Sequence, residues 1–176
     1  MPTSRARPTV AYMTPTDAPH PCVVVGFDGS AASHVALSRA IDRVGSDGRL
    51  YVVHAWDVPE TWRGSGTYQR FEDAALEGAD AVMAQALQTH PSLADVNWES
   101  ELIGGPPAKA IADVANTRGA HEIIVGTRGF GRVRALLGSV AHEVIHLAAC
   151  PVTVIPEQMV ERDAAAHAAE PAATPA

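Results

Sequence analysis

Short apolar runs alternate with segments of helical periodicity along most of the chain. Five of the runs predict β-strands, at residues 22–28, 50–56, 96–103, 123–126 and 152–155. A continuous apolar run such as Val23-Val24-Val25 is typical of a strand that is buried on both faces of a sheet. The third run alternates imperfectly between apolar and polar residues, which favours a less buried strand at the edge of the sheet.

Four helices are predicted between these strands, each with an identifiable start or stop. The first follows Ser30, a favoured N-cap residue, and the second ends before Pro91, which cannot continue a helix. The other two span residues 107–119 and 138–149 approximately, after glycine-containing segments. Strands and helices that alternate with short connections predict a parallel, doubly wound α/β sheet of the Rossmann-like class, with helices on both faces.

Ligands of such sheets bind beyond the carboxyl ends of the strands, where the chain reverses its direction of winding. Glycine-rich segments follow the first and the fourth predicted strands, at residues 26–30 and 126–129. The two segments would face each other across a crevice if these strands were neighbours. Periodicity alone leaves that adjacency open.

Composition bounds the organisation of the chain and its partners. The 176 residues, 47% of them hydrophobic, suit one domain at residues 22–156, with disordered tails at 1–21 and 157–176. The net charge of −7 and the absence of a dense basic run argue against nucleic acid and against an anionic membrane surface. No apolar run reaches the roughly 20 residues of a membrane helix, no secretory signal is recognisable, and two cysteines make no disulfide framework. These features predict a cytoplasmic protein.

The loop between the fourth strand and the last helix is the strongest candidate for a binding site. It contains Gly126, Gly129 and Gly138-Ser139, and glycine allows a ligand close access to backbone N–H groups or a positive φ. Together with a helix N-terminus, such a loop predicts a phosphate site. Arg128, Arg132 and Arg134 add guanidinium groups that can clamp a polyphosphate. Ser139 can donate to a phosphate oxygen, cap the helix, or do both.

The end of the first strand offers a second group of polar atoms. Asp28 can accept hydrogen bonds from ribose hydroxyls or help to hold a metal, or it can be a turn residue beside the helix cap. Neither the dinucleotide fingerprint Gly-x-Gly-x-x-Gly nor a Walker A sequence is present, which excludes a P-loop NTPase. His54 ends the second strand and is interpreted as a satisfied core or rim residue.

A His-Glu-x-x-His sequence at residues 142–146 has the spacing of a zinc protease helix. Helical phase argues against that activity. The residues Val140, Val144, Leu147 and Ala148 share one face, whereas His142 and His146 lie opposite to it and are expected to be solvated.

The ordered set of segments resembles the universal stress protein family, in its ATP-binding branch. The residues that carry the resemblance are Val23-Val-Val-Gly-Phe-Asp-Gly-Ser30, Val52-Val-His-Ala-Trp56, Gly105-Pro-Pro107, Gly126-Thr-Arg-Gly129, Gly138-Ser-Val140 and Cys150-Pro-Val-Thr-Val-Ile-Pro156. The pattern of that branch is Gly-x2-Gly-x9-Gly-Ser/Thr. Here eight residues instead of nine separate Gly129 from Gly138.

The resemblance implies the strand order 3-2-1-4-5, which places strands one and four side by side. It implies ATP in the crevice between them, accompanied by Mg²⁺, with Asp28 on the adenosine side and the backbone near Ala55 beside the adenine. The cofactor-binding residues that it implies are Gly26, Asp28, Ala55, Gly126, Arg128, Gly129, Gly138, Ser139 and Val140.

The resemblance also implies a homodimer. Val152, Val154 and Ile155 of the last strand would pair antiparallel across a two-fold axis and cover an apolar edge. The same strand order places Cys22 and Cys150 two strands apart, about 9–10 Å, which is beyond the reach of a disulfide. Both thiols are therefore expected to stay reduced.

The leading functional hypothesis is a stress-response binding and signalling module that holds ATP and hydrolyses it slowly at most. No residue set offers an evident base and nucleophile, so no catalytic residue is predicted. The shortened glycine loop favours one alternative, a dimeric module that has lost nucleotide binding. A nucleotide-using hydrolase or transferase of the same α/β class is the other, with residues 61–67 as its candidate lid.

Overall fold

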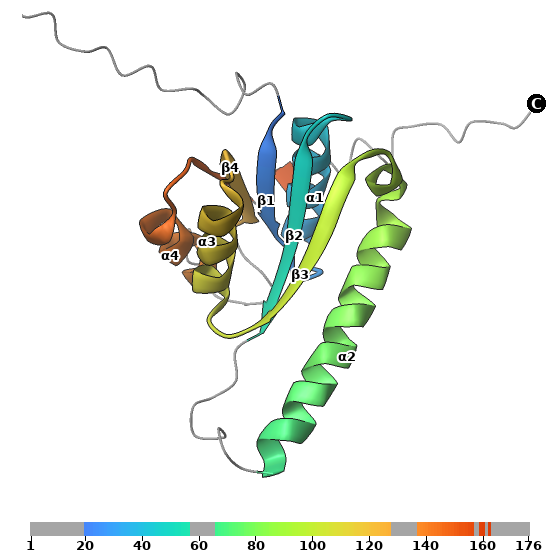
Figure 1. Cartoon of the computed structure of the whole chain (residues 1–176), viewed down its shortest axis with the longest axis vertical. Helices are drawn as coiled ribbons and strands as arrows, with labels where there is room; N and C mark the ends of the chain where they lie inside the picture. Colours follow the sequence, from blue (N-terminus) through green and yellow to red (C-terminus); the bar gives the residue numbers. More distant parts are fainter. Residues whose placement is uncertain (1–19, 57–65, 128–136, 157–158, 161, 163–176) are drawn as a thin grey trace, which may run out of the picture.

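The computed structural model describes residues 20–56, 66–127, 137–156, 159–160 and 162 (Figure 1). Five parallel strands form one sheet in the order β3-β2-β1-β4-β5, which confirms the expected fold and strand order. The strands are β1 (Cys22–Gly26), β2 (Arg49–Trp56), β3 (Asn97–Gly104), β4 (Glu122–Gly126) and β5 (Val152–Ile155). As predicted, β3 is an edge strand and is less buried than β1 or β4.

Helices cover both faces of the sheet. The helices are α1 (Ala31–Val44), α2 (Gly66–Thr89), α3 (Pro107–Arg118) and α4 (Ser139–Leu147), with a 3₁₀ turn η2 (Pro91–Asp95) after α2. One core cluster joins the sheet to α1 and α2, and a second joins it to α3 and α4. No helix within the described ranges is long and apolar enough to cross a membrane.

The central strand β1 lies between these two layers. Val23, Val24 and Val25 are each at most 1% exposed, and they alternate between the two core clusters. Burying a valine side chain contributes roughly 1.5 kcal/mol or more, so this run anchors the middle of the sheet. Its carboxyl end is held in a fixed position relative to the helices on both faces.

Helix α1 has the start and the end that the sequence predicts. The Ser30 side chain accepts a hydrogen bond from the backbone N–H of Ser33, and Gly45 ends the helix with a φ of 56°. The predicted apolar face is buried in full, at Leu37, Ala40, Ile41 and Val44. Because its start follows β1 directly, α1 presents its N-terminus at the carboxyl edge of the sheet.

Helix α4 is shorter than expected, and it buries the predicted face at Val140, Val144 and Ala148 but not at Leu147. It ends at Leu147 instead of about residue 149, because Ala148 already has extended backbone angles. Pro151 also disfavours a helical conformation at the residue before it, so the helix could not continue far. The side chain of Leu147, expected on the apolar face, is 42% exposed, whereas Ala141 and Val144 are buried. The first strand is also shorter than predicted, ending at Gly26 instead of residue 28.

The packed part of the chain extends slightly beyond the expected limits of 22 and 156. The carbonyl of Pro21 accepts a hydrogen bond from the N–H of Arg49, at 2.8 Å. Met159 and Val160 pack against the core cluster on the side of α1. Most of the two expected tails lies outside the described residues.

Candidate functional site

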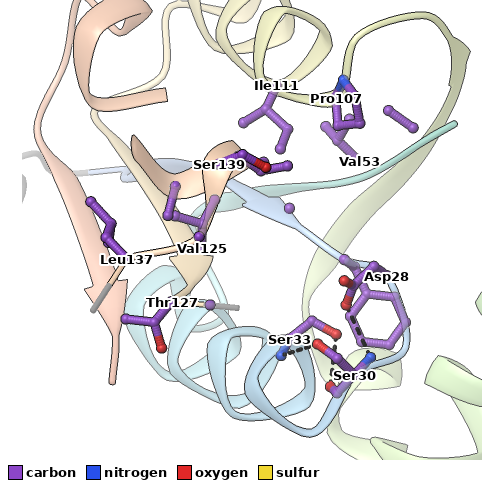
Figure 2. Close-up of a pocket in the computed structure, with 17 residues that line it drawn as sticks. Asp28, Ser30, Ser33, Val53, Pro107, Ile111, Val125, Thr127, Leu137 and Ser139 are labelled. Carbon is purple, nitrogen blue, oxygen red and sulfur yellow. Dashed lines mark hydrogen bonds between the residues drawn. The ribbon is translucent and has the colours of Figure 1, made fainter. Parts of the chain in front are cut away.

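The chain reverses its direction of winding between β1 and β4, which are hydrogen-bonded neighbours. A cavity of about 510 Å³ opens beyond their carboxyl ends (Figure 2). It is lined by the ends of these two strands, by the middle of β2, and by the first turns of α1, α3 and α4. The position is the one at which open α/β sheets bind ligands, and the volume is within the range of small-molecule sites.

Seven of the nine predicted binding residues line this cavity. They are Gly26, Asp28, Ala55, Gly126, Gly138, Ser139 and Val140. Arg128 and Gly129 lie outside the described residues, as do Arg132, Arg134 and most of the candidate lid at residues 61–67. Segments 100 residues apart in the sequence are therefore brought together at one edge of the sheet.

Ten further residues that line the cavity were not predicted from the sequence. They are Phe27, Ser30, Ser33, Val53, Pro107, Ile111, Val125, Thr127, Leu137 and Ala141. Ser30, Ser33 and Pro107 begin helices that follow strand ends, so the rule for ligand position in parallel sheets would have selected them. Val53, Val125 and Ile111 belong to apolar stretches of the sequence that look the same as those of residues buried in the core.

Asp28 is a turn residue that also lines the cavity. Its Oδ1 accepts a hydrogen bond from the N–H of Ser30 at 3.0 Å. Ser30 Oγ then accepts from the N–H of Ser33 at 3.3 Å, and Ser33 Oγ donates to the carbonyl of Ser30 at 2.9 Å (Figure 2). Asp28 therefore acts as a turn residue. The side chains of Asp28 and Ser30 already accept hydrogen bonds from backbone N–H groups at the start of α1.

Among the described residues, no side chain caps the start of α4 in this way. Gly138 is the N-cap residue, with φ −71° and ψ 160°, and its own N–H donates to the carbonyl of Thr127 at 2.7 Å. Capping by Ser139 is thus wrong: Ser139 is the first helical residue, and it is exposed. The first α-helical hydrogen bond of α4 is donated by His142 to Gly138, so the amides of residues 139–141 precede it. These three residues line the cavity at the positive end of a helix dipole.

Two of the predicted glycines lie close to a helix, and at Gly126 the neighbour includes backbone atoms that cannot easily move. A Cβ on Gly26 would lie 2.7 Å from Ile111 Cδ1, and a Cβ on Gly126 would lie 2.8 Å from the Cβ of Ala32. The missing side chains let α3 and α1 approach the strand ends. Positive φ is found at Gly29, Gly45, Gly105 and Gly119, so the positive φ considered for Gly126 is not needed.

His54 is held in a structural role, as the sequence analysis interpreted it. Its half-buried ring donates from Nδ1 to the carbonyl of Phe27 at 2.8 Å. Phe27 in turn donates its N–H to the carbonyl of Val53 at 2.9 Å. The two bonds extend the β1–β2 pairing past the end of β1 and fix the backbone that precedes Asp28.

The cavity is mainly apolar, with charge at one end. Asp28 is the one charged side chain among its described lining residues. The walls include Val53, Ile111, Val125 and Leu137. A flat apolar group of a ligand can pack against these walls. An anion can accept hydrogen bonds from the backbone N–H groups at the start of α4.

The remaining candidate chemistry lies away from this cavity. His142, Glu143 and His146 are exposed on α4, as helical phase predicted. Within the ranges described, no three His, Cys, Asp or Glu side chains are grouped so that they could hold a metal ion. Cys22 and Cys150 are free thiols, and burial raises the pKa of each.

A model of the universal stress protein family matches residues 22–156. This chain belongs to that family. A universal stress protein of Thermus aquaticus is 34% identical over 136 residues, which cover 76% of this chain and 96% of the relative. The solved structure of a universal stress protein from Lactobacillus plantarum matches with a TM-score of 0.67 at 23% identity, covering 78% of this chain and 99% of that one.

Two further solved members of the universal stress protein family were determined with nucleotides. One is a complex with cAMP, with a TM-score of 0.59 at 23% identity over 78% of this chain and 98% of that one. The other is an Arabidopsis thaliana protein with AMP bound, with a TM-score of 0.55 at 16% identity over 77% and 90%. At these identities they share the fold with the present chain.

Proposed function

We propose that this universal stress protein binds an adenine nucleotide, ATP foremost, in the cavity between β1 and β4. One observation carries the proposal: the start of α4, which no described side chain caps, opens onto a cavity that has apolar walls and the carboxylate of Asp28. The relatives solved with cAMP and AMP support adenine as the base. In this role the protein is a nucleotide-dependent binding and signalling module of the cytoplasmic stress response.

Each part of the nucleotide has a suitable counterpart among the lining residues. The adenine would lie against Val53 and Ala55, and the ribose hydroxyls would donate to the carboxylate of Asp28. The phosphates would accept from the amides of Ser139 and Val140, the positive end of α4. Arg128 and Gly129 would complete the phosphate site, and Mg²⁺ would accompany ATP by binding its phosphate oxygens.

The polar groups at the cavity favour binding over catalysis. Among the described lining residues there is no histidine, and Asp28, the one carboxylate, is the group that we assign to the ribose hydroxyls. A general base must be free to accept a proton from the attacking group. We therefore expect any ATP hydrolysis to turn over more slowly than about 1 s⁻¹, the lower limit of typical enzymes.

The exposed edge of the sheet supports a homodimer through β5. This strand pairs with β4 alone among the described strands. Val152 and Val154 are half-buried and would contact the partner across a two-fold axis. Ile155 is 2% exposed within its own core, so only its backbone would contribute, contrary to the expectation for its side chain.

Gly138→Val tests the proposed phosphate position. Gly138 has a backbone conformation that any residue can adopt, so the substitution adds volume to the cavity lining without backbone strain. We expect ATP affinity, measured by calorimetric titration, to fall at least about tenfold, equivalent to one or two lost amide contacts. Gly78→Val is the matched control, because Gly78 is exposed on α2 with nothing within 4 Å of its Cβ position. Unchanged affinity in a folded Gly138→Val variant would contradict the proposed placement.

A further inference from the structure

A histidine of α1 and the histidine that follows α2 meet directly behind the wall of the cavity. His34 Nδ1 on α1 lies 2.9 Å from Nε2 of His90, the residue that follows α2. The two rings are inclined by only 21°, with centroids 5.2 Å apart. His90 is 8% exposed, and its Nδ1 lies 3.4 Å from Ser38 Oγ. Both nitrogens of His90 are therefore engaged with α1.

The hydrogen bond between His34 and His90 depends on the protonation state of the two rings. A neutral imidazole has one N–H and one lone pair, so a nitrogen-to-nitrogen hydrogen bond needs one ring as donor and the other as acceptor. A first added proton buries a charge between the helices, and a second one turns the two facing nitrogens of His34 and His90 into opposed N–H groups. The first proton still leaves one N–H and one lone pair between the rings and is opposed by the burial of its charge, whereas the second removes the acceptor and breaks the contact.

The same pair is connected to the cavity. Phe27 lines the cavity, and its ring meets that of His34 at 89° with a centroid distance of 5.0 Å. Asp28 also lines the cavity, and its carboxylate acts on His34, raising the imidazole pKa against the larger effect of burial. Among the described residues, Asp28 and the two imidazoles are the charged or titratable groups found to act on the pair.

The position of His90 links the pair to the end of α2. The N–H of His90 donates to the carbonyl of Ala86 at 2.9 Å, and its own carbonyl accepts from Leu93 at 3.0 Å, which starts the turn η2. Helix α2 otherwise packs here through the buried side chains of Met83 and Ala86. A displacement of His90 would thus displace the junction between α2 and η2.

We propose that the His34–His90 pair is a proton-sensitive latch that holds the end of α2 against the Phe27–Asp28 wall of the cavity. Acidification releases this end and weakens ligand binding in the cavity. The second statement rests on the proposed nucleotide function, whereas the latch itself does not.

The direction of the pH dependence follows from burial. Burial lowers the pKa of both imidazoles below the ordinary value of 6.5. The unfolded or locally opened chain then binds protons more readily than the closed one. The stabilisation by the latch is complete above pH 6.5 and is lost as the pH falls below 6.5 towards the depressed pKa values.

Hydrogen exchange of the full chain tests the latch without any ligand. We expect protection of the backbone amides around residues 82–93, corrected for intrinsic rates, to fall about fivefold from pH 7.5 to pH 5.5, the effect of one buried hydrogen bond. In His34→Gln, position 34 cannot titrate and only His90 of the pair is left to take up a proton, so this segment should show a smaller fall. His142→Gln, an exposed histidine on α4, is the control and should behave like the wild type. An identical pH response in His34→Gln and in the wild type would overturn the latch.

Proton NMR titration of the wild type covers the case in which His34→Gln does not fold. Two histidine ring signals should titrate below pH 6.5 and depend on each other, as expected for a coupled pair. Independent titration of His34 and His90 at or above 6.5 would overturn the latch.

ATP titration at pH 7.5 and 5.5 tests the link to the cavity. Comparison of the wild type with His34→Gln removes the protonation of ATP itself from the result. We expect the wild type to lose at least fivefold more affinity than the variant on acidification, again the effect of one buried hydrogen bond. An equal loss in both proteins would overturn the link. Failure of ATP to bind at either pH would instead contradict the nucleotide function, with the latch still decided by hydrogen exchange.

Discussion

At the scale of single residues, Gly26 and Gly126 show how packing and ligand binding compete to explain the same glycine. Both line the cavity, yet both also face a helix so closely that a Cβ would lie under 3 Å from Ile111 or Ala32. The glycine loop motif alone cannot separate these two reasons. The structure assigns packing to Gly126. A positive φ is found at none of Gly26, Gly126 and Gly138.

Gly126→Ala tests the packing role. The new Cβ would meet the Cβ of Ala32 at 2.8 Å and its carbonyl carbon at 3.2 Å, and overpacking of this kind typically costs about 1–3 kcal/mol. We expect urea denaturation to show that loss in the free energy of unfolding. Gly78→Ala, in the open part of α2, should instead stabilise the protein by up to about 1 kcal/mol. Equal effects of the two substitutions would show that α1 does not press on Gly126 as described.

At the scale of elements, the starts of α1 and α4 differ although both follow a strand of the same crevice. Ser30 and Asp28 satisfy amides at the start of α1, whereas α4 begins at Gly138 without a side-chain cap. Orphan helix amides need a partner, and a bound anion supplies one. The asymmetry supports the proposal that the phosphates bind at the start of α4.

Ser30→Ala tests the cap of α1. Loss of a serine N-cap typically costs about 1 kcal/mol, and here it would leave the N–H of Ser33 without its acceptor. We expect that loss in chemical denaturation, with a smaller effect on ATP affinity than that of Gly138→Val. Ser46→Ala, at an exposed serine after α1, is the control and should change stability by less than about 0.5 kcal/mol. A Ser30→Ala variant as stable as the control would refute the capping role.

At the scale of the whole molecule, the fold followed from the sequence more completely than the site did. Strand and helix types were predicted from periodicity, and the strand order followed from the family resemblance. The limits of α4 and the exposure of Leu147 were missed, because a short helix next to an edge strand has few core neighbours to fix its face. The turn η2 gave no signal besides Pro91.

The polar residues of the site were predictable and its apolar walls were not. Asp28 and Ser139 stand at strand and helix ends, where the topology of parallel sheets directs attention. Val53, Ile111 and Val125 have the sequence context of core residues, and only their position at the sheet edge distinguishes them. The His34–His90 contact joins residues 56 positions apart, and no local pattern indicates it.

Val154→Lys tests the proposed assembly. A lysine on the half-buried face of an edge strand introduces a charge that an antiparallel β5–β5 contact would have to bury without a partner. We expect multi-angle light scattering to show a dimer for the wild type and a monomer for the variant. Ala84→Lys, on the exposed face of α2, is the control and should remain a dimer. A dimeric Val154→Lys variant would rule out pairing through β5.

Direct detection of a bound nucleotide tests the central claim, that the cavity between β1 and β4 holds an adenine nucleotide. The purified protein is denatured, the released small molecules are separated by chromatography, and the nucleotide-free protein is titrated with ATP, ADP, AMP and cAMP. We expect either a co-purified adenine nucleotide or saturable binding of ATP by the wild type, with binding weakened in Gly138→Val. No released nucleotide and no saturable binding of any of the four would contradict the claim and favour a member of the family that acts without nucleotide.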